Sequence, residues 1–252
     1  MSLSDTEIER YARHIVLREI GGPGQAKLRA AKILSIGAGG LGSPLLLYLA
    51  AAGIGTLGVI DDDAVSLSNL QRQILHATQS VGTLKTDSAR VALAQINPEI
   101  SITTHPARLN AENAEATLKG YDLVCDGSDN FATRHLVNET CVRLGIPLIA
   151  GAIGQWDGQL SVYAPRHGGP CYACVFPVVP AEGLAPSCAD GGVVGALPGV
   201  VGSMMAMEAI KWITGAGEPL LGRLWLYDAL DAETRVMKVK RNRDCAVCGG
   251  TE

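Results

Sequence analysis

The feature of this 252-residue chain that most constrains its fold is a glycine-rich hexapeptide, Gly-Ala-Gly-Gly-Leu-Gly at 37–42, which we call the glycine loop. It fits the pattern G-x-G-x-x-G, follows a predicted strand at 32–36 and precedes a predicted helix at about 44–52. Glycines there let backbone N–H groups approach a phosphate at a helix amino end, where the helix dipole favours an anion. A tight turn that binds nothing has the same pattern, so the loop alone does not separate nucleotide binding from packing, or NAD from ATP.

The segments around the glycine loop alternate between strand and helix. Such alternation predicts a parallel sheet with helices on both faces. Beyond Gly151 we expect strands without crossover helices, except for one long helix, and hence antiparallel pairing. The predicted fold class is α/β, a Rossmann-like mixed sheet with a parallel N-terminal half and antiparallel C-terminal strands. The predicted strands are 32–36, 56–60, 100–105, 123–126, 147–150, 159–163, 223–228 and 234–239, and the main predicted helices are 44–52, 83–96, 130–144 and 200–214.

We expect one domain over 1–252, with N-terminal helices at 1–31, a nucleotide-binding half at 32–150 and a second half at 151–252. Ser4 and Glu7 have the spacing of a capping box, so a helix is predicted from there toward Arg18. The run Gly-Gly-Pro-Gly at 21–24 is expected to break that helix, with a short helix following at about 25–29.

Composition excludes several classes of protein. Hydrophobic residues make up 47% of the chain and the net charge is only −4, which argues against disorder and against non-specific nucleic-acid binding. No charged residue occurs from Ile33 to Ile60, but glycines and Pro44 interrupt this stretch too often for a transmembrane helix. The first residues lack the basic and apolar regions of an export signal, so we expect a cytoplasmic protein without membrane contact.

A polar run follows the second predicted strand. Asp61 lies about 20 residues beyond the glycine loop, where an acidic side chain would bind a ribose. The segment 66–73, Ser-Leu-Ser-Asn-Leu-Gln-Arg-Gln, follows Asp61 in the sequence and contains Arg72. Lys85 begins the next predicted helix. A dehydrogenase has no evident need for these cations, whereas phosphoryl or nucleotidyl transfer needs them against the charge that develops on phosphate oxygens. A solvated polar helix start is the alternative interpretation.

The loop at 126–130, Asp-Gly-Ser-Asp-Asn, follows the fourth predicted strand. Ligands of such sheets bind beyond the carboxyl ends of the strands, so this loop is expected to face the same crevice as the glycine loop. A carboxylate there suits Mg²⁺, which takes one or two carboxylates together with phosphate oxygens. Alternatively, Ser128 or Asp129 only caps the following helix.

Four of the seven cysteines form two Cys-x-x-Cys pairs about 70 residues apart, which predicts a structural zinc site that leaves no coordination position open. The four expected ligands are Cys171, Cys174, Cys245 and Cys248.

Taken together and in this order, these motifs make the chain resemble the bacterial ubiquitin-activating-enzyme-like adenylyltransferases, the MoeB/ThiF/HesA family. The resemblance covers nearly the whole chain, and the segment 66–73 is its most specific part. It rests on Tyr-Ala-Arg at 11–13, the glycine loop, Asp61-x-Asp63, the segment 66–73, Lys85, Asp126-x-x-Asp129-Asn130 and the two cysteine pairs.

The resemblance implies a reaction: ATP-dependent adenylation of the C-terminal Gly-Gly carboxylate of a small ubiquitin-like sulfur-carrier protein, with release of pyrophosphate. It also implies Mg²⁺, structural zinc and a homodimer in which Arg13 reaches the neighbouring subunit's ATP, although by pattern alone Arg13 is a basic residue on an amphipathic helix. Sulfur is expected from another protein. The implied catalytic residues are Arg13, Arg72, Lys85 and Asp129, which also carries Mg²⁺, with a thiol role for Cys188. The implied nucleotide-binding residues are Gly37, Gly39, Gly40, Gly42, Asp61, Asp63, Ser68, Asn69, Gln73 and Asn130.

Three other functions stay open at this point. An NAD-dependent oxidoreductase would use the glycine loop and Asp61, but no obvious Tyr-x-x-x-Lys pattern accompanies them. An ATP-dependent enzyme that activates a carboxylate on tRNA would need a basic stripe, which the net charge of −4 disfavours. A silent scaffold would keep the zinc site and the dimer without turnover.

Overall fold

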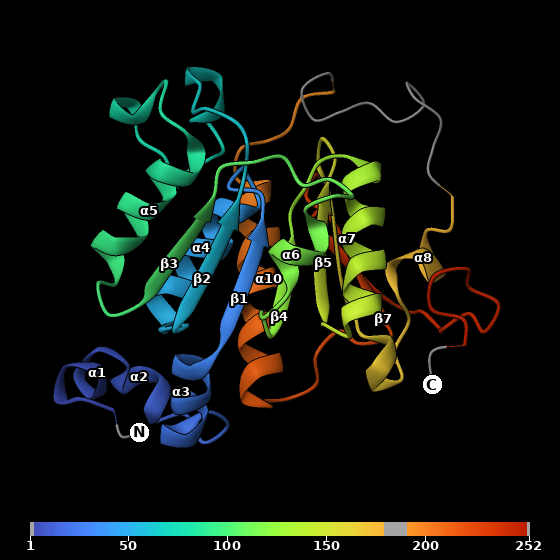
Figure 1. Ribbon diagram of the computed structural model, residues 1–252, viewed down its shortest axis with the longest axis horizontal. Coiled ribbons are helices and arrows are strands. Elements are labelled where there is room, and N and C mark those ends of the chain that lie inside the picture. Colours follow the sequence, from blue (N-terminus) through green and yellow to red (C-terminus); the bar gives the residue numbers. More distant parts are fainter. Residues whose placement is uncertain (1–2, 179–190, 251–252) are drawn as a thin grey trace.

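The computed structural model describes residues 3–178 and 191–250, which form a single eight-stranded sheet with helices on both faces (Figure 1). The strands lie in the order β3-β2-β1-β4-β5-β6-β7-β8. Their bounds are β1 Lys32–Ile36, β2 Thr56–Ile60, β3 Ser101–His105, β4 Leu123–Asp126, β5 Leu148–Ile153, β6 Asp157–Tyr163, β7 Arg223–Asp228 and β8 Glu233–Lys238.

The longer helices alternate with the strands, and several short ones occupy loops. The α-helices are α1 Asp5–Arg10, α2 Ala12–Ile15, α3 Gly21–Ala30, α4 Gly42–Ala52, α5 Lys85–Ile96, α6 Ala114–Leu118, α7 Phe131–Leu144, α8 Tyr172–Val175 and α10 Leu197–Thr214, and the 3-10 helices are η1 Leu67–Asn69, η2 Thr78–Ser80 and η3 Pro165–His167. Among the described residues, no helix has the length and apolar character that crossing a membrane requires.

The sheet changes from parallel to antiparallel at β5, as the sequence predicts. Strands β3, β2, β1, β4 and β5 pair in parallel, and β5–β6, β6–β7 and β7–β8 are antiparallel. Ile36, the last residue of β1, lies opposite Ile60 of β2 and Asp126 of β4. Three loops therefore leave the sheet side by side at the edge where the strand order reverses, which is where ligands bind in such sheets.

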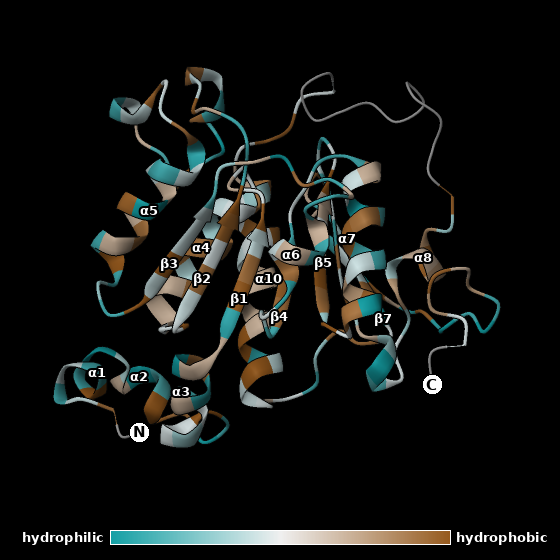
Figure 2. Ribbon diagram, in the orientation of Figure 1, coloured by the Kyte–Doolittle hydropathy of each residue, from teal (hydrophilic) through white to brown (hydrophobic). Residues whose placement is uncertain are grey.

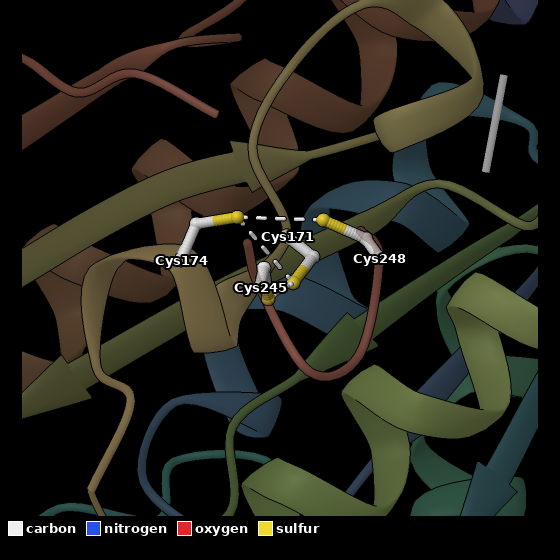
Figure 3. A group of neighbouring side chains, drawn as sticks. All are labelled: Cys171, Cys174, Cys245 and Cys248. Atoms are coloured by element: carbon white, nitrogen blue, oxygen red, sulfur yellow. Dashed lines mark hydrogen bonds between the residues drawn. The ribbon is translucent and has the colours of Figure 1, made fainter. Parts of the chain in front are cut away.

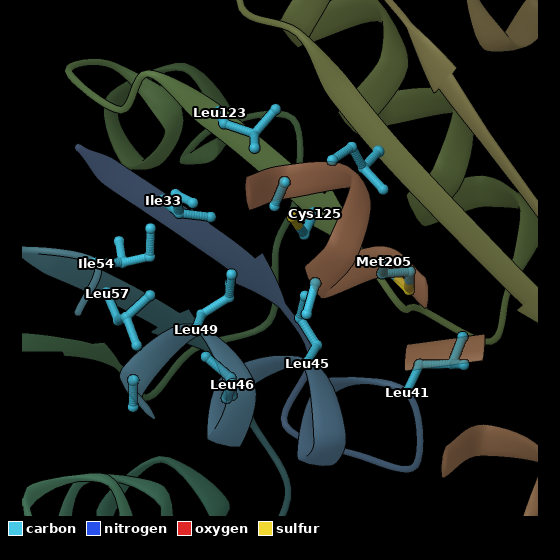
Figure 4. Packing of buried hydrophobic residues seen from close by; sticks show 14 of the residues in the cluster. Ile33, Leu41, Leu45, Leu46, Leu49, Ile54, Leu57, Leu123, Cys125 and Met205 are labelled. Carbon is cyan, nitrogen blue, oxygen red and sulfur yellow. The ribbon is translucent and has the colours of Figure 1, made fainter. Parts of the chain in front are cut away.

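Alternate residues of each strand feed two separate cores, because successive side chains point to opposite faces. Ile33, for example, packs with α4, α5 and α10 on one face, whereas Leu34 packs with α6, α7 and α8 on the other. Apolar residues are concentrated on the central strands and on the helices that cover them (Figure 2). Figure 4 shows Leu45 and Leu49 of α4 beside the first of these strand faces. The two cores hold the carboxyl ends of the strands in place.

The N-terminal helices differ from the prediction. Ser4 and Glu7 form the expected capping box, but α1 ends at Arg10, and the glycine run at 21–24 begins helix α3 instead of breaking it. Close packing favours glycine at one of these positions: a Cβ at Gly24 would lie 2.9 Å from the Ile20 side chain, which would have to move. Proline at 23 is tolerated because it lies in the first turn of the helix, where its missing N–H costs nothing.

Candidate active site

A cavity of about 510 Å³ lies at the carboxyl ends of β1, β2 and β4, between the three loops. Its size is typical of a site for a small ligand. Ten of the predicted site residues line it, together with several residues that were not predicted to form the site, among them Asp62, Arg108, Ser128, Arg134, Gln159 and Tyr172. The predicted lining residues are Gly37, Gly39, Gly40, Asp61, Asp63, Arg72, Gln73, Lys85, Asp129 and Asn130.

The glycine loop is held in a tight turn against β2. Gly37 has a positive φ of 92°, and a Cβ at Gly42 would collide with the Gly37 carbonyl oxygen, so two of the glycines are required by backbone geometry. The Ala38 N–H donates to Oδ2 of Asp61 at 2.8 Å, and the Asp63 N–H donates to Oδ1 at 2.9 Å. Each carboxylate oxygen can accept a further hydrogen bond, so Asp61 retains the capacity to bind a ribose hydroxyl.

Burial raises the pKa of the Asp61 carboxyl above its ordinary value of 3.8, and the neighbouring Lys85 ammonium opposes this rise. Asp61 therefore protonates at a higher pH than an exposed aspartate does.

The predicted cations lie on the side of the cavity formed by the segment after β2. Lys85 is buried at the start of α5, and its Nζ lies 2.7 Å from Oδ2 of Asp63. The Arg72 guanidinium donates to the Ser68 carbonyl at 3.2 Å. Gln73 is buried, and its Oε1 atom has no hydrogen-bond partner among the described residues. This side of the cavity thus offers two positive charges to an anionic ligand, and the buried Gln73 amide oxygen can accept a hydrogen bond.

The loop after β4 supplies the acidic side of the cavity. Asp126 is fully buried, with Oδ1 accepting from the Ser128 N–H at 2.8 Å, while its Oδ2 atom has no partner among the described residues. Asp129 is exposed and lines the cavity, whereas Asn130 caps α7 by accepting from the Thr133 N–H. The helix-capping role that we considered for Ser128 or Asp129 therefore belongs to Asn130.

Sequence reasoning missed Arg134. It lies on α7, is buried, and its guanidinium donates to the carbonyl oxygens of Ser128 and, at 2.9 Å, Gly151. It therefore connects the acidic loop to β5. A single arginine in a helix has the pattern of an exposed residue, and only the sheet brings these two carbonyls to it.

Four of the described residues predicted to be catalytic or nucleotide-binding do not line this cavity. Ser68 hydrogen-bonds Ser66, and the Asn69 amide accepts from the Ser66 N–H, so both shape the turn that precedes Arg72. Gly42 ends the glycine loop and begins α4. Arg13 is exposed on α2, at the opposite end of the sheet from the loops (Figure 1). Cys188 falls outside the described residues. The roles of all five stay predictions.

A second cleft of about 540 Å³ opens from the first along the sheet. The two share Phe131, Ala152, Ile153 and Gln159, so they form one continuous depression. The outer part is lined by β5, β6, β7 and β8, including Gly154, Gly158, Tyr227, Asp228, Glu233 and Arg235.

The four paired cysteines lie together, as their spacing predicts (Figure 3). Their sulfurs are 3.8 Å apart for Cys171 and Cys174, 3.6 Å for Cys171 and Cys245, and 3.4 Å for Cys174 and Cys248. A tetrahedron with Zn–S bonds of about 2.3 Å has edges of about 3.8 Å, so the cluster fits a zinc ion. Burial would raise the pKa of the Cys245 thiol, but hydrogen bonds from the backbone N–H groups of Cys248 and Val247 outweigh it and lower the pKa to about 7.

The cluster lies close to the cavity in sequence as well as in space. Tyr172 follows Cys171 directly, lines the cavity, and packs its ring against His135, Tyr163 and Phe176. The Tyr172 N–H donates to the Asn138 side chain of α7 at 2.8 Å. The same short segment therefore carries two of the clustered cysteines and one wall of the cavity.

The fold and this cavity define an α/β protein with a candidate ligand site at the carboxyl ends of its parallel strands and a candidate Cys₄ metal site. Residues 11–247 match the ThiF family, and the chain belongs to that family. This confirms the resemblance and the fold class predicted from the sequence.

Two curated relatives match over almost their whole length. The sulfur carrier protein adenylyltransferase of Thermus thermophilus is 50% identical over 99% of this chain and 93% of its own. The SAMP-activating enzyme E1 of Haloferax volcanii is 46% identical, with 99% and 92% covered. A crystal structure of Escherichia coli MccB with ATP has the same fold, with a TM-score of 0.84 and 26% identity over 98% of this chain and 75% of that one.

Proposed function

We propose that this protein adenylates the C-terminal carboxylate of a small ubiquitin-like sulfur-carrier protein with ATP, releasing pyrophosphate. The names of the two full-length relatives bear out the activity expected from the sequence. The observation that carries the proposal is that Arg72, Lys85 and Asp61 line the same cavity as the glycine loop. An NAD-dependent oxidoreductase would account for the loop and Asp61, but not for the two cations.

The chemistry needs positioning more than proton transfer. A terminal carboxyl group has a pKa of about 3.5, so it is already a nucleophilic anion at neutral pH and needs no general base. It attacks the α-phosphorus, and the bond to the β,γ-pyrophosphate breaks. Arg72 offers a planar fork to phosphate oxygens and Lys85 a point charge, so both stabilise the charge that develops on the phosphates. The Asp61 carboxylate would orient the ribose.

Asp129 fits the role of a Mg²⁺ ligand. Its carboxylate is exposed, lines the cavity and has no hydrogen bond or ion pair among residues 3–178 and 191–250. Bound Mg²⁺ would neutralise charge on the leaving pyrophosphate. Asp126, with one buried oxygen lacking a partner, lies in the same loop and can support that site.

The second cleft suits the tail of the carrier. An extended Gly-Gly terminus is narrow, and Gly154 and Gly158 line the outer part of the cleft, which joins the nucleotide cavity at Gln159 and Phe131. We therefore place the tail along β6 and β7, with its carboxylate directed toward the cavity.

The remaining parts of the proposal concern assembly. The working unit would be a homodimer, because α2, which carries Arg13, lies at the opposite end of the sheet from the loops that line the cavity (Figure 1). Zinc in the cysteine cluster would be structural, since four sulfurs complete a tetrahedron and leave no position for substrate. The carrier would receive its sulfur afterwards from another protein.

Exchange of radioactive pyrophosphate into ATP tests the proposed function. We expect exchange only when a carrier ending in Gly-Gly is present, because pyrophosphate is released only after the carboxylate has attacked. The matched control is the same carrier without its two terminal glycines, which should support no exchange. Absence of exchange with every sulfur carrier of the source organism would refute adenylation, and a nicotinamide fluorescence change on titration with NADH would favour the oxidoreductase.

A further inference from the structure

The carbonyl groups of the glycine loop are held by buried side chains. Ser35 Oγ donates to the Gly37 carbonyl at 2.9 Å, and Ser43 Oγ donates to the Gly39 carbonyl at 2.7 Å. Both serines are fully buried, one at the end of β1 and one at the start of α4. The first and third peptide groups of the loop therefore have fixed orientations.

His76 holds the carbonyl between them. Its Nε2 atom lies 2.9 Å from the Ala38 carbonyl oxygen, and its Nδ1 atom lies 2.9 Å from Oγ of Ser88 on α5. A carbonyl oxygen only accepts, so Nε2 carries the proton, and Nδ1 accepts from the Ser88 hydroxyl. His76 is buried, and burial lowers its pKa, which favours this neutral form at neutral pH. Ser88 thus selects the tautomer that donates to the loop.

Fixing these carbonyls also orients the N–H groups. In a trans peptide the carbonyl of one residue and the N–H of the next point in opposite directions. Holding the Ala38 carbonyl against His76 therefore turns the Gly39 N–H the other way, and Gly39 lines the cavity. The N–H groups of Gly39 and Gly40 have no acceptor among the described residues, so both are available to a ligand.

His76 also connects two parts of the site. It follows Arg72 and Gln73 in the same segment, and its N–H donates to the Gln73 carbonyl at 3.1 Å. The imidazole therefore ties the segment that carries the cation to the loop that offers the N–H groups. A displacement of either part would change the phosphate site as a whole.

We propose that His76 is a positioning residue for nucleotide binding, whose Nε2–H holds the Ala38 peptide so that the glycine-loop N–H groups face the phosphates of ATP. This inference rests on the proposed function for the identity of the nucleotide. It predicts that His76 acts on the affinity for phosphates and not on the affinity for the nucleoside.

The test compares His76→Phe with His76→Gln in the full chain. Phenylalanine fills the space without a donor, so the Ala38 carbonyl loses its partner and we expect ATP affinity by calorimetry to fall about tenfold. Glutamine can place an amide N–H near the position of Nε2, so we expect its affinity to stay within about threefold of the parent. Adenosine affinity should change less than about twofold in both variants, because adenosine has no phosphate for the loop to bind.

His167→Phe is the matched control, because His167 is exposed in η3 and does not line the cavity. Ser88→Ala keeps the imidazole and removes its orienting hydroxyl, so it should weaken ATP binding about threefold and leave adenosine binding unchanged even if His76→Phe fails to fold. Equal losses for ATP and adenosine, or glutamine no better than phenylalanine, would overturn the role of His76. If the parent binds ATP but shows no carrier-dependent exchange, adenylation fails while the role of His76 in ATP binding stands.

Discussion

Lys85 illustrates how the surroundings of a single residue in this cavity favour the binding of an anionic ligand. Its side chain is buried, and its ion-pair partner Asp63 is exposed, so solvent already screens the pair from one side. A triphosphate can replace Asp63 as the partner without leaving a buried carboxylate unpaired. The energetic cost of exchanging one partner for the other is therefore small.

Replacing Lys85 or Arg72 with alanine should lower kcat/KM for carrier adenylation by about 10²–10³, because each provides a fixed positive charge against the phosphates. The measurement is pyrophosphate exchange with saturating carrier. Arg90→Ala is the control, since Arg90 is exposed on α5 and pairs only with Asp87 among the described residues. Retention of more than a tenth of the activity by either site variant would contradict the assignment.

Asp61 predicts a pH dependence of nucleotide affinity. The ribose hydroxyl donates to an ionised carboxylate, so binding weakens as the pH falls through the pKa of Asp61. Burial raises that pKa above 3.8, and the loss should therefore begin at a higher pH than for an ordinary aspartate. Titrating ATP from pH 7.5 downward should show a fall in the ratio of the parent's affinity to that of Asp61→Asn. Parallel profiles for the two proteins would argue against a role in ribose binding.

At the scale of elements, buried strands were the easiest to predict. Strands β1, β2, β4 and β7 have the predicted bounds, because short apolar runs between glycine or polar residues leave little choice of register. Short elements such as α6 and α8 were missed, since four or five residues carry too little periodicity. The helix predicted at 25–29 is longer in the structure, Gly21–Ala30, because it packs against α10. No local sequence pattern records that contact.

The cysteine cluster joins α8 to the C-terminal segment, so zinc is predicted to hold these two elements together. Native mass spectrometry should find one zinc ion per chain, and Cys248→Ser should lose it. We expect the unfolding midpoint of that variant to fall by roughly 10 °C, because bound metal contributes several kcal/mol to folding. Cys141→Ala is the control: Cys141 is buried in the α7 core and is not part of the cluster, so zinc should be retained. Zinc retention by Cys248→Ser would exclude the four-sulfur site.

At the scale of the whole molecule, helices α1, α2 and α3 lie at the end of the sheet opposite the carboxyl ends of β1 and β2 (Figure 1), where the cavity lies. Tyr11 anchors these helices to the body, with its hydroxyl accepting from the Asn97 side chain at 2.8 Å, and Glu7 pairs with Arg29 at 2.9 Å. Arg13 is exposed on these anchored helices, and it makes no hydrogen bond or ion pair with the described residues. Such a residue is placed to contact another molecule.

Mixing two inactive variants tests whether Arg13 acts in a second subunit. Arg13→Ala and Lys85→Ala should each be inactive alone, but a mixed dimer contains one complete site. With random pairing of equal amounts, about a quarter of the parental activity should return after subunit exchange. The control is a mixture of Arg10→Ala with Lys85→Ala. All activity of this mixture should come from the Arg10→Ala homodimers and from the mixed dimers. No recovery in the first mixture would exclude a shared site.

The glycine loop, the polar segment 66–73, the cysteine pairs and most strands could be predicted from the sequence, because each depends on residues that are close neighbours along the chain or on periodic patterns. Which of these groups meet depends on how the strands pair. Parallel pairing brings the ends of β1, β2 and β4 together, and this placed Arg134 between two carbonyls and His76 against Ala38. The contacts of Arg134 with Gly151 and of His76 with Ala38 join residues 17 and 38 positions apart, and no local pattern records them because the sheet, not the neighbouring sequence, sets the distance.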